Sequence, residues 1–117
     1  MEGESWIFFF GDQLVGTVSL YEGLKKRMSA DYYRNPGVYL FGQFAISPIH
    51  QGKGWGSKVM DFVEARAREI GGSELALDTS EHAARLISMY EKRGYEIVSA
   101  TQWPTVNYRS LILSKKL

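Results

Sequence analysis

The chain has 117 residues, 44% of them hydrophobic and 14% aromatic, which suits one domain with a buried core. A formal net charge of +1 argues against a nucleic-acid-binding surface, and the absence of cysteine excludes disulfides, thiolate zinc sites and a cysteine nucleophile. The acidic start Met1–Ser5 is unlike a signal peptide, and no apolar run reaches the roughly 20 residues that span a bilayer. We therefore expect one cytoplasmic domain over residues 1–117 that binds neither nucleic acid nor membrane.

Two β-rich runs open the chain. Trp6–Phe10 and Leu14–Tyr21 are separated by a Gly-Asp turn, a pattern typical of a hairpin. Trp6–Phe10 is apolar on both faces, so it should be covered on both faces or paired with a further strand. The polar segment 22–36 is expected to be a loop with one helical turn. Its basic residues 25–27 and Arg34 either face solvent or meet phosphates or an acidic substrate.

Val38–Ile46 is the strongest strand pattern in the chain. Gly42 within it suggests a bulge or a close backbone approach, and the neighbouring Gln43 needs a hydrogen-bond partner in an otherwise buried run. From Gly54 to Ile70 the hydrophobic period becomes that of an amphipathic helix. Two glycines, at positions 71 and 72, end that helix.

The remaining chain predicts three more strands and one more helix. The strands are Glu74–Asp78, Tyr95–Val98 and Tyr108–Leu113, and the helix carries an apolar stripe from Ala83 to Tyr90. Residues 101–107 are expected to be a loop, and Lys115 and Lys116 a basic tail. The order β-β-β-α-β-α-β-β predicts an α+β fold. Its mixed, mostly antiparallel sheet would contain a central parallel pair joined by a right-handed crossover, with the two helices packed on it.

Glycines occupy every second position between the third strand and the first helix, at Gly52, Gly54 and Gly56. A strand that enters a helix through such a turn leaves backbone N–H groups free, and the helix dipole adds positive charge, so the pattern predicts a phosphate site. It is not a P-loop, because Gly52-Lys53 is not followed by Ser or Thr. Nor is it the dinucleotide fingerprint, because the spacing is G-x-G-x-G. A plain glycine-rich turn is the alternative.

The segment Gln51-x-x-Gly54-x-Gly56 resembles the Q/R-x-x-G-x-G/A loop of the GNAT family of N-acetyltransferases. Ala45–Pro48 before the loop and Met89–Tyr95 after it resemble two further family segments at the same spacing. The resemblance covers residues 6–117 and implies a GNAT-like fold that uses acetyl-coenzyme A as acetyl donor, with no metal.

The resemblance also implies that the chain starts at the second strand of the family and lacks its usual N-terminal strand and helices. Trp6–Phe10 would then form an exposed sheet edge. Because an exposed apolar edge invites pairing, we expect a homodimer.

The resemblance also implies the site residues. Phe44, Ala45 and Ile46 would pair through their backbone with the pantetheine arm, unless they are used in ordinary sheet pairing. The residues that would hold the pyrophosphate are Gln51, Gly52, Lys53, Gly54, Trp55, Gly56 and Ser57, although Lys53 could instead point to solvent. Tyr90 would contact the cofactor and act as general acid, unless it is a core tyrosine.

Asp78 would act as general base, with ordering of the turn at 79–82 as the alternative role. Gln43 cannot take a proton, and His82 at a helix start is expected to face solvent. The implied reaction is direct attack of an unidentified amine on acetyl-coenzyme A in a ternary complex. The alternative is a non-catalytic acyl-coenzyme A-binding module that acts as a sensor or assembly partner.

Overall fold

The computed structural model describes residues 3–24 and 30–117. Its strands are β1 (Gly3–Phe10), β2 (Gln13–Glu22), β3 (Val38–Ile46), β4 (Glu74–Ser80), β5 (Glu96–Thr101) and β6 (Ser110–Lys116). Its helices are α1 (Trp55–Glu69), α2 (Ala84–Lys92) and the short 3-10 helices η1 (Asp31–Arg34) and η2 (Pro48–His50). The basic residues 25–27 lie outside the described residues.

The strands form one sheet in the order β1-β2-β3-β4-β6-β5. Every neighbouring pair is antiparallel except β3 and β4, which are parallel. The predicted mixed sheet with a central parallel pair is therefore confirmed. The helical turn expected in segment 22–36 is η1.

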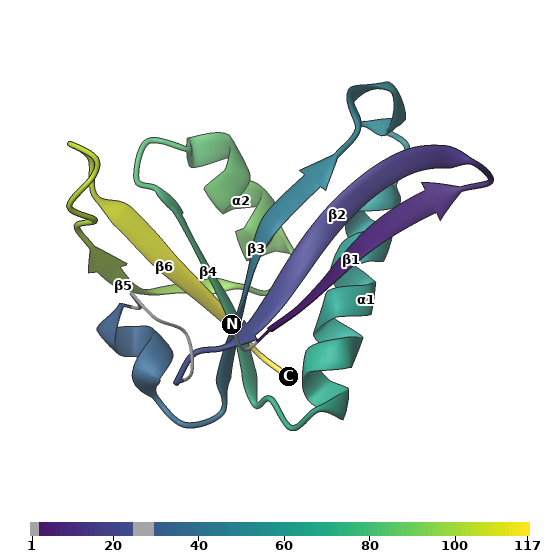
Figure 1. The fold of residues 1–117 in the computed structure, drawn as a ribbon. Helices are drawn as coiled ribbons and strands as arrows, with labels where there is room; N and C mark the ends of the chain where they lie inside the picture. Colours follow the sequence, from purple (N-terminus) through teal and green to yellow (C-terminus); the bar gives the residue numbers. More distant parts are fainter. Residues whose placement is uncertain (1–2, 25–29) are drawn as a thin grey trace.

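The sheet opens between its two central strands. β3 and β4 pair only from Val38↔Glu74 to Leu40↔Ala76, and beyond this point they diverge (Figure 1). Residues 41–46 of β3 therefore have β2 on one side and an opening on the other. A row of backbone groups that would otherwise be used by the sheet faces this opening.

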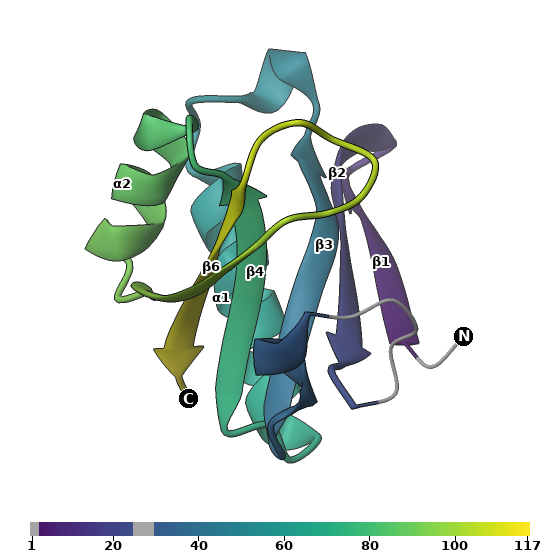
Figure 2. The same ribbon diagram turned by 90° about the vertical axis from the view of Figure 1, so that its left-hand side faces the viewer.

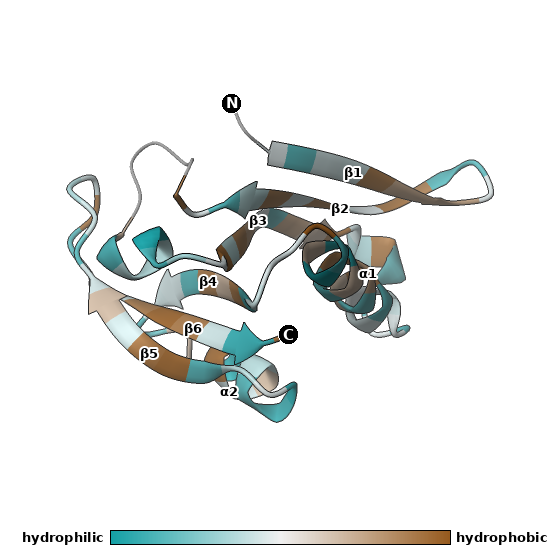
Figure 3. Ribbon diagram, turned by 90° about the horizontal axis from the view of Figure 1, so that it is seen from below, coloured by the Kyte–Doolittle hydropathy of each residue, from teal (hydrophilic) through white to brown (hydrophobic). Residues whose placement is uncertain are grey.

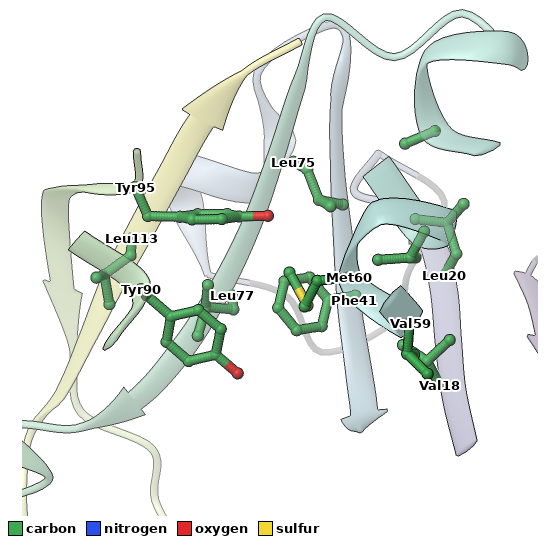
Figure 4. Packing of buried hydrophobic residues seen from close by; sticks show 12 residues of the cluster. Val18, Leu20, Phe41, Val59, Met60, Leu75, Leu77, Tyr90, Tyr95 and Leu113 are labelled. Carbon is green, nitrogen blue, oxygen red and sulfur yellow. The ribbon is translucent and has the colours of Figure 1, made fainter. Parts of the chain in front are cut away.

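The two long helices lie on one face of the sheet, and η1 lies on the other (Figures 2 and 3). Val63 and Ala67 of the apolar stripe of α1 are fully buried in the core between this helix and β2, β3 and β4. Figure 4 shows this core, in which Phe41 of β3 lies between α1 and the ring of Tyr90. A smaller cluster around Tyr33 of η1 fills the opposite face.

β1 is covered on one face only. Trp6 and Phe8 pack edge-on against Phe62 of α1, with ring centroids 5.0 and 5.3 Å apart. Ile7 and Phe9, in contrast, are 62% and 60% exposed. The expectation that both faces of this strand are covered is therefore met on one face only, and β1 is an edge of the sheet (Figure 3).

Two local expectations need correction. β1 begins at Gly3 rather than at Trp6, because the polar residues before the aromatic run also pair with β2. The basic tail is part of β6, where Lys115 pairs with Leu75 of β4. The bulge expected at Gly42 is confirmed, and the neighbouring Gln43 has a positive φ of 51°. Among the described residues, no helix has both the length and the apolar character that a membrane span needs.

Candidate functional site

The turn between η2 and α1 has the backbone conformation that its glycines predict. Gly52 and Gly54 have φ of 75° and 85°, a region that side chains with a Cβ rarely adopt. Gly54 is the N-cap of α1, and no side chain caps the helix. The turn is also tied to the end of β3, because Gln51 Nε2 donates to the carbonyl of Ile46 at 3.0 Å.

This turn presents a row of unpaired backbone donors. Among the described residues, none supplies an acceptor to the N–H groups of residues 52–57. The first N–H of α1 with a partner is that of Lys58, which donates to Gly54 at 3.2 Å. Free donors at a helix N-terminus, together with the helix dipole, favour a negatively charged ligand.

A groove of about 1200 Å³ runs from this turn along β3 to α2. Its walls include eight of the residues predicted to bind the cofactor: Phe44, Ala45, Ile46, Gln51, Gly52, Gly56, Ser57 and Tyr90. The other three predicted residues, Lys53, Gly54 and Trp55, belong to the turn but do not line the groove. Trp55 contacts Phe10 of the hairpin and lies under the ammonium group of Lys58.

The groove favours an anion through its side chains as well. Arg85, Lys92 and Arg93 line it, and among the residues that the structure describes no carboxylate or histidine does. Its apolar lining includes Met60 of α1 and Leu86 and Met89 of α2. A ligand that is anionic at one end and apolar along its length therefore fits this groove by charge and polarity.

Tyr90 belongs both to the core and to the groove. It is 6% exposed, and its ring packs against Phe41 and Tyr95 with centroids 6.0 and 5.7 Å apart. Burial raises the pKa of the Tyr90 hydroxyl, so the hydroxyl stays protonated at neutral pH. No side chain among the described residues hydrogen-bonds to it, which leaves its proton available to a ligand.

Asp78 does not line this groove. Its carboxylate accepts hydrogen bonds from Tyr33 Oη at 2.7 Å and from Trp103 Nε1 at 3.0 Å, on the face of the sheet that carries η1. Burial, followed by the nearby charge of Asp78 and the hydrogen bond to it, raises the pKa of Tyr33, so this hydroxyl remains a donor. The structure thus separates Asp78 from Tyr90 by the thickness of the sheet. The third titratable candidate, His82, is exposed.

An ion-pair network under the groove was not predicted from the sequence. Glu64 of α1 is 6% exposed and accepts from Arg93 Nε at 3.0 Å, from Lys115 Nζ at 3.1 Å and from Tyr95 Oη at 2.8 Å. Arg93 also donates to Ser57 Oγ at 3.1 Å, within the row of free N–H groups. The network therefore joins α1, the end of α2 and β6 next to the turn at residues 52–57. The one hint of this network in the sequence is that Glu64 lies next to the apolar stripe of α1.

This network determines the protonation of Glu64. Burial alone would raise the pKa of its carboxyl, but the hydrogen bonds from Arg93, Tyr95 and Lys115 outweigh burial and lower the pKa. Burial, the Glu64 charge and the Glu64 hydrogen bond raise the pKa of Tyr95. Glu64 thus stays ionised in the core because its hydrogen-bond partners stabilise the charge.

The chain is similar to known proteins of one family in both sequence and fold. The model of the acetyltransferase (GNAT) family matches residues 1–95, and no curated protein sequence matches. An acetyltransferase from Bacillus subtilis, solved in complex with coenzyme A, superimposes with a TM-score of 0.77 at 18% identity over 99% of this chain and 78% of that chain. A GNAT acetyltransferase from Elizabethkingia anophelis with acetyl-coenzyme A bound gives 0.76 at 15% identity, over 99% of this chain and 77% of that one. A putative GNAT acetyltransferase from Desulfovibrio desulfuricans gives 0.80 at 18% identity, over 98% and 69%.

The ion-pair network predicts a pH-dependent contribution to stability. Glu64→Gln should lower the free energy of unfolding at pH 7 by about 2 kcal/mol or more, because Arg93 and Lys115 lose a buried anionic partner. The folded-state pKa of Glu64 is depressed, so its contribution is complete above the unfolded-state pKa and disappears as the pH falls through the folded-state value. The difference between parent and variant in urea unfolding should therefore shrink below about pH 4.

The matched control is Glu69→Gln on the same helix, where the side chain is 69% exposed. It should change stability little at any pH. A Glu64→Gln difference that stays constant from pH 7 to pH 3 would contradict the assigned protonation state.

Proposed function

Because the chain belongs to the acetyltransferase (GNAT) family, we propose that residues 1–117 form one N-acetyltransferase domain that moves an acetyl group from acetyl-coenzyme A to an amine. The observation that carries the proposal is the row of free N–H groups at residues 52–57, at the end of a basic groove. Two structural neighbours were solved with coenzyme A or acetyl-coenzyme A bound, which supports the same ligand here.

In the proposed complex, the pyrophosphate of the donor accepts hydrogen bonds from the N–H groups of the turn. Arg85 and Lys92 add positive charge along the groove. The pantetheine arm follows β3, where Phe44, Ala45 and Ile46 line the groove beside the opening in the sheet. An extended arm that lies along a strand edge pairs with its backbone as an added strand would.

The reaction then needs a hydrogen-bond donor for the leaving thiolate and an acceptor for the proton that the amine loses. The amine nitrogen attacks the thioester carbon, the carbon–sulfur bond breaks, an amide forms, and the thiolate leaves. Tyr90 donates a hydrogen bond to the sulfur as negative charge develops on it. A phenol has a pKa near 10, and burial raises that of Tyr90 further, whereas a thiol titrates near 8.5. Complete proton transfer to the thiolate is therefore uphill by about 2 kcal/mol or more, and stabilisation of developing charge is the better role.

The proton lost by the amine leaves on the other face of the sheet. Asp78 is the carboxylate that we propose as its acceptor, directly or through a water molecule. Tyr33 and Trp103 hold that carboxylate in a fixed orientation on β4, beyond the last paired residue of the opening. The amine would thus approach from the face opposite the donor groove.

A non-catalytic coenzyme A-binding module is the second candidate. The observation in its favour is that, within residues 3–24 and 30–117, no carboxylate or histidine lines the groove that would hold the donor. Such a module would bind coenzyme A through the same turn and would transfer no acetyl group.

Coenzyme A binding should depend on the absence of a side chain at Gly56. A Cβ there would contact only Phe44 Cζ at 3.7 Å and Ile46 Cγ1 at 3.8 Å, and the φ of Gly56 is not positive, so Gly56→Val should fold. The added side chain would keep a phosphate from two or more N–H groups. Calorimetry should show coenzyme A affinity reduced about 100-fold. Ala65→Val, on the exposed side of the same helix, is the control. Equal affinities for the two variants would exclude this turn as the phosphate site.

Turnover should depend on the Tyr90 hydroxyl. With a panel of primary amines, the parent protein should release thiol from acetyl-coenzyme A, and Tyr90→Phe should lower kcat at least about tenfold while the affinity for coenzyme A stays unchanged. A variant as active as the parent would show that the hydroxyl does not assist the leaving group. If the parent binds coenzyme A tightly but releases no thiol with any of the amines, the binding module would be favoured instead.

We also propose that two copies associate along β1, the longer and more apolar edge of the sheet. Ile7→Lys would introduce a charge into that edge and should convert a dimer into a monomer in light scattering. Ile97→Lys on β5, the opposite edge, is the matched control and should remain dimeric. A parent protein that is monomeric at high concentration would contradict this association.

A further inference from the structure

Gln43 has an unusual backbone conformation at the centre of the sheet. It is the one non-glycine residue with positive φ within residues 3–24 and 30–117. It lies in a bulge of β3, where the pairing with β2 jumps from Thr17↔Ala45 to Ser19↔Gly42. Such conformations cost free energy and persist only where the surroundings hold them, so they often mark functional positions.

The surroundings hold Gln43 at both its backbone and its side chain. Thr17 Oγ1 donates to the Gln43 carbonyl at 2.8 Å, and Ser19 Oγ donates to Gln43 Oε1 at 2.6 Å. Ser19 is 2% exposed and lies 2.7 Å from Ser5 Oγ. Because the single hydroxyl proton of Ser19 is used on Gln43, Ser5 is the donor in that pair. One hydroxyl group thus holds the backbone of Gln43, and a second, itself held by a third, holds its side-chain amide.

These contacts leave one part of the amide without a partner. Gln43 Oε1 accepts from Ser19, while its Nε2 group finds no acceptor among the residues that the structure describes. The side chain is exposed, so Nε2 is available to a ligand. A fixed donor with two N–H bonds thus projects from the sheet.

Gln43 and Asp78 stand on opposite walls of the opening between β3 and β4. Both follow the last paired residues of their strands, Leu40 and Ala76. Ser19, which holds Gln43, alternates in β2 with Val18 and Leu20, whose side chains face α1, so Gln43 points to the other face. Asp78 points to that face as well, toward η1.

We propose that Gln43 selects the acceptor by donating a hydrogen bond to a carbonyl oxygen near the reacting amine. This inference rests on the proposed acetyltransferase function. The acceptor class that it names is an α-amino carbonyl compound, whose amino group meets Asp78 and whose carbonyl oxygen meets Gln43. An amine without that oxygen cannot form the hydrogen bond with Nε2, so it binds more weakly than the amino carbonyl compound.

The test compares glycinamide with propylamine, which has no carbonyl oxygen, in the thiol-release assay. The quantity measured is the ratio of kcat/KM for glycinamide to kcat/KM for propylamine. Comparison of this ratio between variants cancels the intrinsic reactivity of each amine. Gln43→Ala should lower the ratio roughly five- to tenfold, because one hydrogen bond to the acceptor is lost. A tripeptide amide that begins with glycine, assayed alongside, distinguishes a small amino amide from a peptide terminus as the source of the carbonyl group.

Two further variants sharpen the test. Gln43→Glu keeps the shape and the bond from Ser19 but replaces the outward donor with an acceptor, so it should lose the preference as Gln43→Ala does. The control is Gln13→Ala, which replaces an exposed glutamine of β2. This variant should have the same ratio as the parent. A ratio unchanged in both Gln43 variants, or kept in Gln43→Glu, would overturn the role of Gln43. Failure of the parent to acetylate any of these amines would contradict the proposed function itself.

Discussion

Six consecutive residues, 52–57, present backbone N–H groups that no other described residue satisfies, and the rest of the site depends on them. Unpaired amides of this kind are tolerated because these residues are exposed or half-buried rather than in the core. Gly52 and Gly54 supply the positive φ that turns the chain so sharply between β3 and α1. The first turn of α1 then adds the positive end of its dipole at the same place.

The divergence of β3 and β4 lets the site continue from the turn along β3. Their parallel pairing stops after Leu40 and Ala76, so the outer half of β3 borders an opening (Figure 1). The donor groove lies on the helical face of that opening, between α1 and α2. The polar side chains Gln43 and Asp78 reach the opposite face. One sheet thus separates the proposed donor from the proposed acceptor, and the opening is where the two would meet.

The walls of the groove are held together by charge as well as by apolar packing. Arg93 at the end of α2 binds Glu64 and Ser57 of α1, and Lys115 of β6 binds the same glutamate. A buried ion network of this kind is costly to break, because each partner left alone is a desolvated charge. It keeps the end of α2 at a fixed position beside the turn at residues 52–57.

How much the sequence could predict depends on how far apart along the chain the interacting residues lie. The glycine turn, the stripe of α1 and the order of strands and helices along the chain depend on neighbouring residues, and the structure contains them. The partners of Asp78 could not be predicted, because Tyr33 and Trp103 lie 45 and 25 residues away along the chain. The same holds for Glu64, whose partners come from α2 and β6. The strained φ at Gln43, rather than at the adjacent glycine, is set by hydroxyl groups of β1 and β2.

The central claim is that the backbone amides of residues 52–57 bind the pyrophosphate of coenzyme A through hydrogen bonds. Backbone amide NMR spectra recorded during a titration with coenzyme A test it most directly. The account predicts that the amide signals of residues 52–57 shift most and gain protection from hydrogen exchange as the complex forms. Binding of coenzyme A that leaves those signals unmoved, or no binding at all, would contradict it.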